Sequence, residues 1–431
     1  MNLPISQPTQ YFDATDLEVA PAMDSNCPPD WAGARWIGSI DASSLTEHSR
    51  LKLLVFDGYE RARLLVREGT SVRGFIDVVA PGGLVDTSVL EAVVSALPAA
   101  VSSASSASTP FITVVVCTRD RASHLRGSLA AILRLDYPSF DVLVIDNAAK
   151  TTETEDVVRA EFGDPRVRLI AEPVPGLSRA RNTGLRHARG EIVAFTDDDT
   201  VVDPAWLREI AAGFDRASDV ACVTGLVPGG ELRSRFQGFF EDRVSWSRVV
   251  EPKIFTLAEP PADLPTFPFC VGEFGTGANF ALNRRIALSM GAFDTAFGVG
   301  TRTGGAEDLD MFTRVILDGY SLVVQPSAIV WHRHRDDLDT LRLQARGYGT
   351  ALGAWITKVL LNPRTARLAL ARSPRALRIL FGKAARPSGS SVLPQERDPQ
   401  IAEVLRIEMA SVARGPLKYF LQRLSGEGVI R

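Results

Sequence analysis

"EIVAFTDDDT", residues 191–200, places three adjacent aspartates directly after a run of apolar residues. A run of this length and composition predicts a buried β-strand, so three like charges stand at the end of that strand. Neighbouring carboxylates repel one another, and such a cluster is usually tolerated where a cation lies against it. The stretch therefore predicts a strand whose carboxyl end faces a cationic ligand.

Strand-like and helical segments alternate on both sides of this stretch. Strand-like runs rich in apolar residues at 112–117, 141–146 and 167–172 come before it, and another at residues 220–225 follows it. Apolar residues at helical spacing lie between these runs. Alternation of this kind predicts an α/β fold with a mostly parallel sheet flanked by helices. Ligands bind at the carboxyl ends of the strands in such sheets, where the aspartates lie.

Composition divides the chain into four parts. A Ser/Ala/Pro linker at residues 98–110 precedes the alternating pattern of residues 111–345. Residues 1–97 contain short strand-like runs and one helical run, which predict a small α+β module without recognisable chemistry. Residues 346–431 predict a basic helical region, whose last helix we expect at residues 401–424.

The overall composition excludes several classes of protein. The chain has 431 residues, 45% of them hydrophobic, and a formal net charge of -3, so it lacks the basic excess expected of a nucleic-acid binder. Its four cysteines have no paired spacing, which indicates reduced thiols. The sequence shows neither a secretory signal pattern nor an uncharged apolar run of about 18 residues. We therefore expect a cytoplasmic protein that does not cross a membrane.

Basic residues gather in the segment 340–386. Arginines and lysines alternate there with leucine, isoleucine, phenylalanine and tryptophan at helical spacing. A surface of this kind can rest on anionic lipid, which would place the protein peripherally at the inner face of the membrane. Packing of the same basic helices against the α/β domain is the alternative.

The aspartate triplet has the chemistry of a metal site. Alternate side chains of an extended segment share a side, so Asp197 and Asp199 would face one ion together while Asp198 points away. Two carboxylates are typical of an Mg²⁺ or Mn²⁺ site that leaves other positions to water and substrate phosphates. A solvated turn, or a cluster capping the next helix, is the alternative.

Six stretches of the chain, taken in order, resemble the family 2 glycosyltransferases, which have the GT-A fold. They are "VVVCTRDRASHLRGSLAAIL" (114–133), "DVLVIDNA" (141–148), "GLSRARNTGLRHARGEIVAFTDDDT" (176–200), "GTGANFALNRR" (275–285), "GGAEDLDMFTR" (304–314) and "PSAIVWHRH" (326–334). The resemblance covers residues 111–334, roughly half the chain. It implies inverting transfer of a hexose or deoxyhexose from a nucleoside-diphosphate sugar, with UDP or dTDP favoured, to a hydroxyl of a glycan or lipid-linked acceptor.

The resemblance also implies roles for the aspartates. Asp197, Asp198 and Asp199 match the Asp-x-Asp motif, through which Mn²⁺ or Mg²⁺ bridges the protein to the diphosphate of the donor. Asp197 and Asp199 would be metal ligands, and Asp197 and Asp198 would contact the donor. In the family a histidine after a later strand can complete the metal site, and its position favours His332 over His334. An imidazole beside two carboxylates would favour Mn²⁺, whereas a structural histidine is the alternative.

Four further residues would bind the nucleotide. Asp146 matches the family's carboxylate that accepts a hydrogen bond from the nucleobase, usually uracil. Thr118 and Arg119 would line the same nucleotide pocket, and Arg181 resembles an arginine that contacts the donor. A turn aspartate and solvated arginines are the alternatives.

Residues near 277 and 308 would bind the sugar and the acceptor. Asp308 aligns with the family's catalytic base, because an acceptor hydroxyl becomes a good nucleophile only as its proton is removed. Glu307, Gly277 and Asn279 would lie beside the donor sugar or the acceptor. The alternatives are carboxylates that complement a helix dipole and an ordinary glycine-rich turn.

Two other functions remain open at this point. A sugar nucleotidyltransferase also combines an α/β sheet with Mg²⁺ and carboxylates, but it needs a glycine-rich phosphate loop after the first strand, and "CTRDRASHL" (117–125) has no glycine. A carbohydrate-binding protein that kept the fold and lost catalysis is the second alternative. The joint presence of Asp146, Asp197, Asp199 and Asp308 argues against it.

Overall fold

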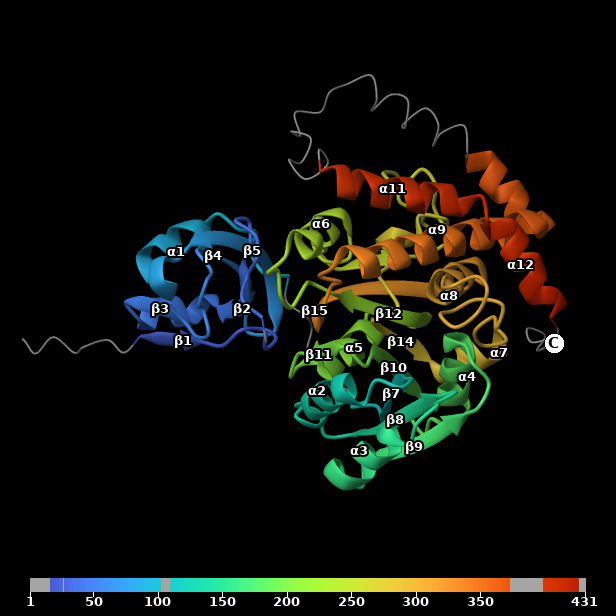
Figure 1. The fold of residues 1–431 in the computed structure, drawn as a ribbon, viewed down its shortest axis with the longest axis horizontal. Helices are drawn as coiled ribbons and strands as arrows, with labels where there is room; N and C mark the ends of the chain where they lie inside the picture. The colour runs from blue at the N-terminus through green and yellow to red at the C-terminus, as the bar shows by residue number, and fades with distance from the viewer. Residues whose placement is uncertain (1–15, 26, 102–108, 373–397, 426–431) are drawn as a thin grey trace, which may run out of the picture.

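The computed structural model describes residues 16–25, 27–101, 109–372 and 398–425. A nine-stranded sheet forms the centre of this described chain, with the strand order β11-β15-β12-β14-β10-β7-β8-β9 and with β13 paired to β15 (Figure 1). The strands are β7 (Ile112–Thr118), β8 (Phe140–Asn147), β9 (Val167–Glu172), β10 (Ile192–Asp197), β11 (Thr200–Val202), β12 (Val220–Leu226), β13 (Lys253–Phe255), β14 (Asn279–Asn283) and β15 (Ser321–His332).

The α/β prediction is confirmed, and the sheet is mixed rather than uniformly parallel. Strands β9, β8, β7 and β10 are parallel, as the runs rich in apolar residues predicted. Strand β14 lies antiparallel between β10 and β12, and β15 pairs in parallel with β12. The carboxyl end of β10, where Asp197 lies, is therefore in the middle of the sheet.

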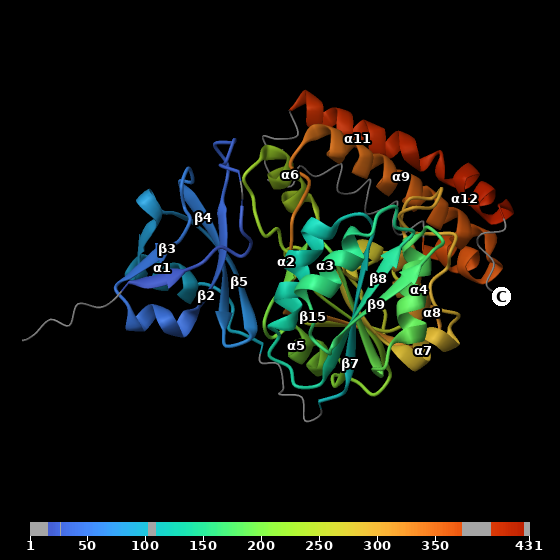
Figure 2. The same ribbon diagram turned by 60° about the horizontal axis from the view of Figure 1, so that its bottom comes forward.

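Helices cover both faces of the sheet, because alternate residues of each buried strand point to opposite sides. Val114 and Val116 of β7 pack with α2 and α5, whereas Val115 packs with α4. Figure 2 shows α2 and α3 on one side of β7 and β8, and α4 on the other. The helices of this domain are α2 (Ala122–Leu133), α3 (Glu153–Glu161), α4 (Leu177–His187), α5 (Trp206–Phe214), α6 (Arg235–Arg243), α7 (Arg284–Ser289), α8 (Glu307–Leu317) and the 3-10 helix η3 (Val271–Glu273).

A small α+β module precedes the central sheet and packs against one of its edges. Ile37, Leu65 and Val72 of the module share an apolar cluster with Ile329 and Trp331 of β15. The module is therefore attached to the strand that ends at His332. Its elements are β1 (Leu17–Val19), β2 (Trp36–Asp41), η1 (Ala42–Glu47), β3 (Arg50–Leu53), β4 (Arg61–Glu68), β5 (Ser71–Val79), η2 (Pro81–Gly83), β6 (Leu84–Asp86) and α1 (Thr87–Ser95).

Three further helices, α9 (Leu338–Leu361), α11 (Pro399–Val412) and α12 (Gly415–Leu424), lie together on the central domain (Figure 1). The predicted boundary between residues 345 and 346 falls inside α9. The single helix predicted at residues 401–424 is wrong, because two helices, α11 and α12, occupy it. Gly415 packs so closely on α9 that a β-carbon there would lie 2.3 Å from the backbone nitrogen of Ala354, and Pro416 follows without an N–H group.

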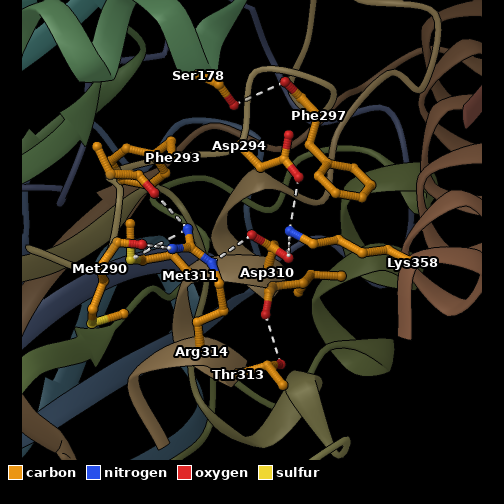
Figure 3. A network of polar contacts seen from close by, with 12 residues as sticks. Ser178, Met290, Phe293, Asp294, Phe297, Asp310, Met311, Thr313, Arg314 and Lys358 are labelled. Atoms are coloured by element: carbon orange, nitrogen blue, oxygen red, sulfur yellow. Dashed lines mark hydrogen bonds and ion pairs between the residues drawn. The ribbon is translucent and has the colours of Figure 1, made fainter. Parts of the chain in front are cut away.

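One basic residue of α9 and one of α12 make ion pairs with the domain beneath them. Figure 3 shows Lys358 between two carboxylates, with its Nζ 2.8 Å from Asp294 Oδ2 and 2.5 Å from Asp310 Oδ1. Arg423 of α12 binds the same Asp294 oxygen at 2.6 Å. Of the two interpretations of segment 340–386, packing on the domain therefore holds for Lys358; residues 373–386 lie outside the described residues. None of the helices in the described ranges has the length and apolar content needed to cross a membrane.

Candidate active site

A cavity of about 670 Å³ opens at the carboxyl ends of β7, β10 and β15. The aspartate triplet forms part of its floor, and α9 and the loop at residues 299–304 form part of its wall. The side chains from α9 were not predicted as site residues, although the stretch "QARGY" (344–348) lies there. Lining residues from α9 are Thr340, Leu343, Gln344, Gly347 and Tyr348.

The three aspartates have different partners. Asp197 is the last residue of β10, whereas Asp198 and Asp199 lie in a turn, so the extended segment predicted for them is wrong. Asp198 accepts hydrogen bonds from Thr118 Oγ1 at 2.7 Å and from Arg121 Nη1 at 2.6 Å. Arg121 also donates to Asp199 Oδ2 at 2.8 Å. Arg121 therefore orients two of the three carboxylates, and the sequence reasoning missed it although it stands two residues after Arg119.

Asp197, Asp199 and His332 come together as three ligands for one cation. One ligand atom from each of them lies within 4.8 Å of the other two. His332 Nε2 is 3.5 Å from Asp199 Oδ1, and that buried oxygen has no hydrogen-bond partner among the described residues. A buried carboxylate oxygen without a donor is costly unless a cation binds it. Two carboxylates and one imidazole fit Mn²⁺, and with more water ligands Mg²⁺.

Burial changes the protonation of these ligands. It raises the pKa of Asp197 to about 7, and the charge of Asp199 adds to this effect. It also lowers the pKa of His332 to about 4, so at pH 7 the imidazole is neutral and keeps a lone pair. Burial opposes ionisation of Asp199 too, but nearby cations, including the guanidinium of Arg121, hold its pKa below the usual range. A divalent cation between these groups would favour the ionised form of both carboxylates.

The residues predicted to bind the nucleotide line two different cavities. Thr118 and Arg119 line the main cavity, whereas Asp146 lines a second one, of about 560 Å³, beside α3 and β9. Asp146 is the register partner of Thr118 on the neighbouring strand, and the next residue, Asn147, reaches the main cavity, so a single nucleotide pocket stays a prediction. Asp146 Oδ1 is buried without a hydrogen-bond partner among the described residues, and burial raises the Asp146 pKa to about 6.

Arg181 is buried beneath the site rather than exposed to it. Its side chain is 3% exposed, and its guanidinium donates to Glu307 Oε1 and to the carbonyl of Gly277, each at 2.9 Å. The same guanidinium is 3.7 Å from Asp197 Oδ1. The predicted direct contact with the donor is corrected for this reason: the hydrogen bonds of Arg181 fix neighbouring protein groups.

Asp308 lies in the first turn of α8, held by backbone groups. Its Oδ2 accepts from the N–H of Gly277 at 2.7 Å, and its Oδ1 accepts from the N–H of Leu309 at 2.8 Å. A β-carbon on Gly277 would lie 3.0 Å from both Arg181 and Asp308, so this close approach favours glycine. Burial and the charge of Asp308 raise the pKa of Glu307 to about 7.

Asn279 has no free group for a sugar, which corrects its prediction as a sugar contact. Its side chain is fully buried in the sheet. Its Oδ1 accepts from Trp206 Nε1 at 2.8 Å, and its Nδ2 donates to the carbonyls of Leu226 and Ala328. These bonds join β14 to its neighbours and to α5, so the residue stabilises the sheet.

His334 differs from His332 in its surroundings. It is 3% exposed, and its Nε2 is 2.8 Å from Glu241 Oε2 of α6. Its Nδ1 is 3.3 Å from His332 Nδ1. No local sequence pattern indicated Glu241, which lies far from both histidines along the chain.

Comparisons with known proteins agree with this geometry. The model of the family described as glycosyl transferase family 2 matches residues 113–285. The pre-mycofactocin glycosyltransferase of Mycobacterium tuberculosis is 26% identical over 231 residues, which are 53% of this chain and 43% of that protein. The glucosyl-dolichyl phosphate glucuronosyltransferase of Haloferax volcanii is 24% identical over 191 residues, 43% of this chain and 57% of that protein. The chain thus spans about half the length of these curated relatives.

Among solved structures, this chain is similar to the mannosyltransferase PcManGT of Pyrobaculum calidifontis, determined in complex with GDP-Man and Mn²⁺. It is 20% identical, with a TM-score of 0.46, over 72% of this chain and 88% of that chain. The family match and the observed α/β sheet confirm the GT-A-type fold and the glycosyltransferase class predicted from the sequence. Residues 113–285 of the chain belong to glycosyl transferase family 2.

Proposed function

We propose that the protein is a metal-dependent, inverting glycosyltransferase. It transfers a sugar from a nucleoside-diphosphate donor to a hydroxyl of a glycan or lipid-linked acceptor. The observation that carries this proposal is the cluster of Asp197, Asp199 and His332 beside the main cavity, with its unpartnered Asp199 oxygen, in a chain of this family.

Asp197, Asp199 and His332 would hold Mn²⁺ or Mg²⁺. When bound, such an ion offsets the negative charge that develops on the departing diphosphate. Arg121 and Thr118 hold Asp198, and Arg121 holds Asp199, so the floor of the cavity is preorganised for a donor. Arg119, whose side chain is 39% exposed at the same cavity, is a cation available to the phosphates.

Asp308 is the proposed base. The acceptor oxygen attacks the anomeric carbon as the bond from that carbon to the diphosphate breaks, and the Asp308 carboxylate takes the hydroxyl proton. One base opposite the leaving group gives inversion at the anomeric carbon. Arg181 is a positioning residue in this scheme, because it joins Glu307, beside the base, to the Gly277 carbonyl.

The second cavity supports the proposal of a uridine or thymidine donor. Asp146 presents a buried carboxylate oxygen there without a partner among the described residues. An ionised carboxylate only accepts hydrogen bonds, and uracil and thymine offer a ring N–H to such an acceptor. The name of the Haloferax relative includes a dolichyl phosphate, which supports a lipid-linked acceptor.

The membrane contact proposed for segment 340–386 extends to α12. Leu417, Phe420 and Leu424 of α12 are 63%, 47% and 82% exposed, and Lys418 lies among them. A helix with exposed apolar residues and a cation can rest on anionic lipid at the inner face of a cytoplasmic membrane. Co-sedimentation with vesicles containing phosphatidylglycerol should fall when Leu417 and Leu424 are replaced by serine, and unchanged sedimentation would contradict this contact.

A panel of sugar nucleotides with MnCl₂ tests the proposed function. One donor should raise the melting temperature and release nucleoside diphosphate when an acceptor hydroxyl is supplied, and EDTA should abolish both effects. Release of pyrophosphate from a nucleoside triphosphate and a sugar phosphate would instead indicate a nucleotidyltransferase. Sugar binding without any release would indicate a binding protein.

A further inference from the structure

A chain of buried polar groups leads away from the proposed metal ligands into the protein. It runs from Asp199 through His332 and His334 to Glu241, with distances of 3.5 Å, 3.3 Å and 2.8 Å between consecutive atoms. The side chains of His334 and Glu241 are each 1% exposed. The chain therefore connects the floor of the cavity to a carboxylate on α6 that solvent does not reach.

The Glu241 end is rigidly packed. The ring of Phe240 lies 4.8 Å from the ring of His334, between centroids. A β-carbon on Gly229 would come within 3.1 Å of the His334 ring and 3.2 Å of Glu241 Oε2. Both side chains are thus closely packed, and the observed atom pairs indicate the hydrogen bonds.

The protons along this chain can be assigned from one end. Glu241 Oε2 accepts the backbone N–H of Gly229 at 3.0 Å and lies 2.8 Å from His334 Nε2, so this oxygen is the acceptor at the buried end of the chain. An ionised carboxylate only accepts, so His334 Nε2 must donate to it. A metal ligand needs a lone pair, so His332 as a ligand through Nε2 carries its proton on Nδ1, which donates to His334 Nδ1.

This assignment leaves a lone pair on His332 Nε2, the atom that faces Asp199 Oδ1. Two acceptors 3.5 Å apart repel each other when no proton lies between them. A divalent cation that binds both atoms converts this repulsion into attraction, and Asp199 Oδ1 has no other partner among the described residues. A metal-binding histidine commonly has its second nitrogen fixed in this way by a neighbouring acceptor.

We propose that His334 and Glu241 are positioning residues that fix His332 in the Nδ1–H tautomer, so that its Nε2 presents a lone pair to the divalent cation. The inference rests on the metal site of the proposed function. The competing arrangement has a doubly protonated His334 that donates to His332 Nδ1, in which case His332 Nε2 carries a proton toward Asp199 and cannot bind metal.

Ring nitrogen NMR on wild-type protein distinguishes these two arrangements. The protein contains five histidines, so ¹⁵N-histidine labelling gives a simple spectrum, which single substitutions assign. In MgCl₂ we expect a protonated Nδ1 and an unprotonated Nε2 for His332, and the reverse pattern for His334. A protonated His332 Nε2 under these conditions would overturn the proposal.

Two amide variants test the positioning role with the metal alone. In His334→Asn the amide oxygen can occupy the place of Nδ1 and accept from His332, whereas in His334→Gln the amide reaches Glu241 instead. Titration with MnCl₂, followed by the EPR signal of free Mn²⁺, should show affinity within about threefold of wild type for His334→Asn and a loss of about tenfold or more for His334→Gln. Equal affinities for the two variants would contradict the proposal.

Asp242→Asn is the matched control, because this neighbouring carboxylate on α6 faces Arg35 of the amino-terminal module, at 3.5 Å, and not the histidines. Its Mn²⁺ affinity should equal that of wild type. None of these readouts needs a donor or an acceptor. If the tautomers are as stated but no sugar is transferred, the proposed function is wrong and this inference stands. If sugar is transferred but His332 carries its proton on Nε2, this inference is wrong and the proposed function stands.

Discussion

Replacing Gly353 by alanine should push α9, which forms part of the cavity wall, away from α11 and α12. A β-carbon at Gly353 of α9 would lie 2.0 Å from the carbonyl oxygen of Val412 and 3.1 Å from the Cα of Gly415. These are backbone atoms, so α9 must move by about 1 Å or more to reach an ordinary contact distance of about 3.5 Å. Such overpacking costs about 1–3 kcal/mol, and we expect the upper end because no flexible side chain can yield. Alanine regains about 1 kcal/mol of helix propensity, which leaves about 2 kcal/mol of net destabilisation.

Thermal unfolding measures this effect. A loss of about 2 kcal/mol should lower the melting temperature by about 2 °C in a protein of this size. Gly347→Ala on the same helix is the control, because its β-carbon would meet only the carbonyl oxygen of Gly304, at 3.7 Å. That variant should melt at or slightly above the wild-type temperature. If Gly353→Ala is as stable as Gly347→Ala, the close contact of α9 with α11 and α12 is refuted.

Other substitutions test the groups around the cavity. Asp308→Asn should lower sugar transfer by about 100-fold or more while the donor still raises the melting temperature; transfer at the wild-type rate would remove Asp308 as the base. The pKa of Asp146 is raised from 3.8 to about 6 in the folded protein. Ionisation of this group therefore costs no stability below pH 3.8 and has its full cost above pH 6. Wild-type stability should fall as pH rises between these two values. In urea unfolding, the stability gained by Asp146→Asn should therefore grow by about 1 kcal/mol from pH 5 to pH 7.5, and a pH-independent difference would contradict the burial of this charge. Arg181→Lys should lose about 2–3 kcal/mol of stability, because a lysine cannot hold both Glu307 and the Gly277 carbonyl in the same geometry; a melting temperature equal to that of wild type would disprove this role.

The sequence predicted the strands of the central sheet well for a physical reason. Parallel strands buried on both faces are rich in apolar residues, and the buried strands β7 and β8 extend only one or two residues beyond the expected runs. The partly exposed strand β9 spans the six residues expected of it. The ends of these strands correctly placed the aspartates on the side of the sheet where the parallel strands end. The proximity of Asp197 and Asp199 was also expected, although a turn and not an extended segment produces it.

Contacts between segments far apart in the chain were not predictable from periodicity. The amide of Asn279 could hydrogen-bond a sugar, but it is occupied by Trp206 instead. Trp206 is 73 residues away, and only the folded sheet brings the two together. Glu241 reaches His334 across 93 residues in the same way. The crossing of α9 with α12 depends on two glycines, Gly353 and Gly415, whose pairing no local pattern reveals. Local sequence therefore defined the elements, and tertiary packing decided which polar groups reach the cavity.

Anomalous diffraction at the manganese edge tests the central claim most directly, with crystals grown in MnCl₂ and a nucleoside diphosphate. We predict one strong peak within coordination distance of Asp197, Asp199 and His332 Nε2, with the diphosphate as a further ligand. A peak elsewhere, with these three side chains free of metal and the diphosphate bound away from them, would contradict the account.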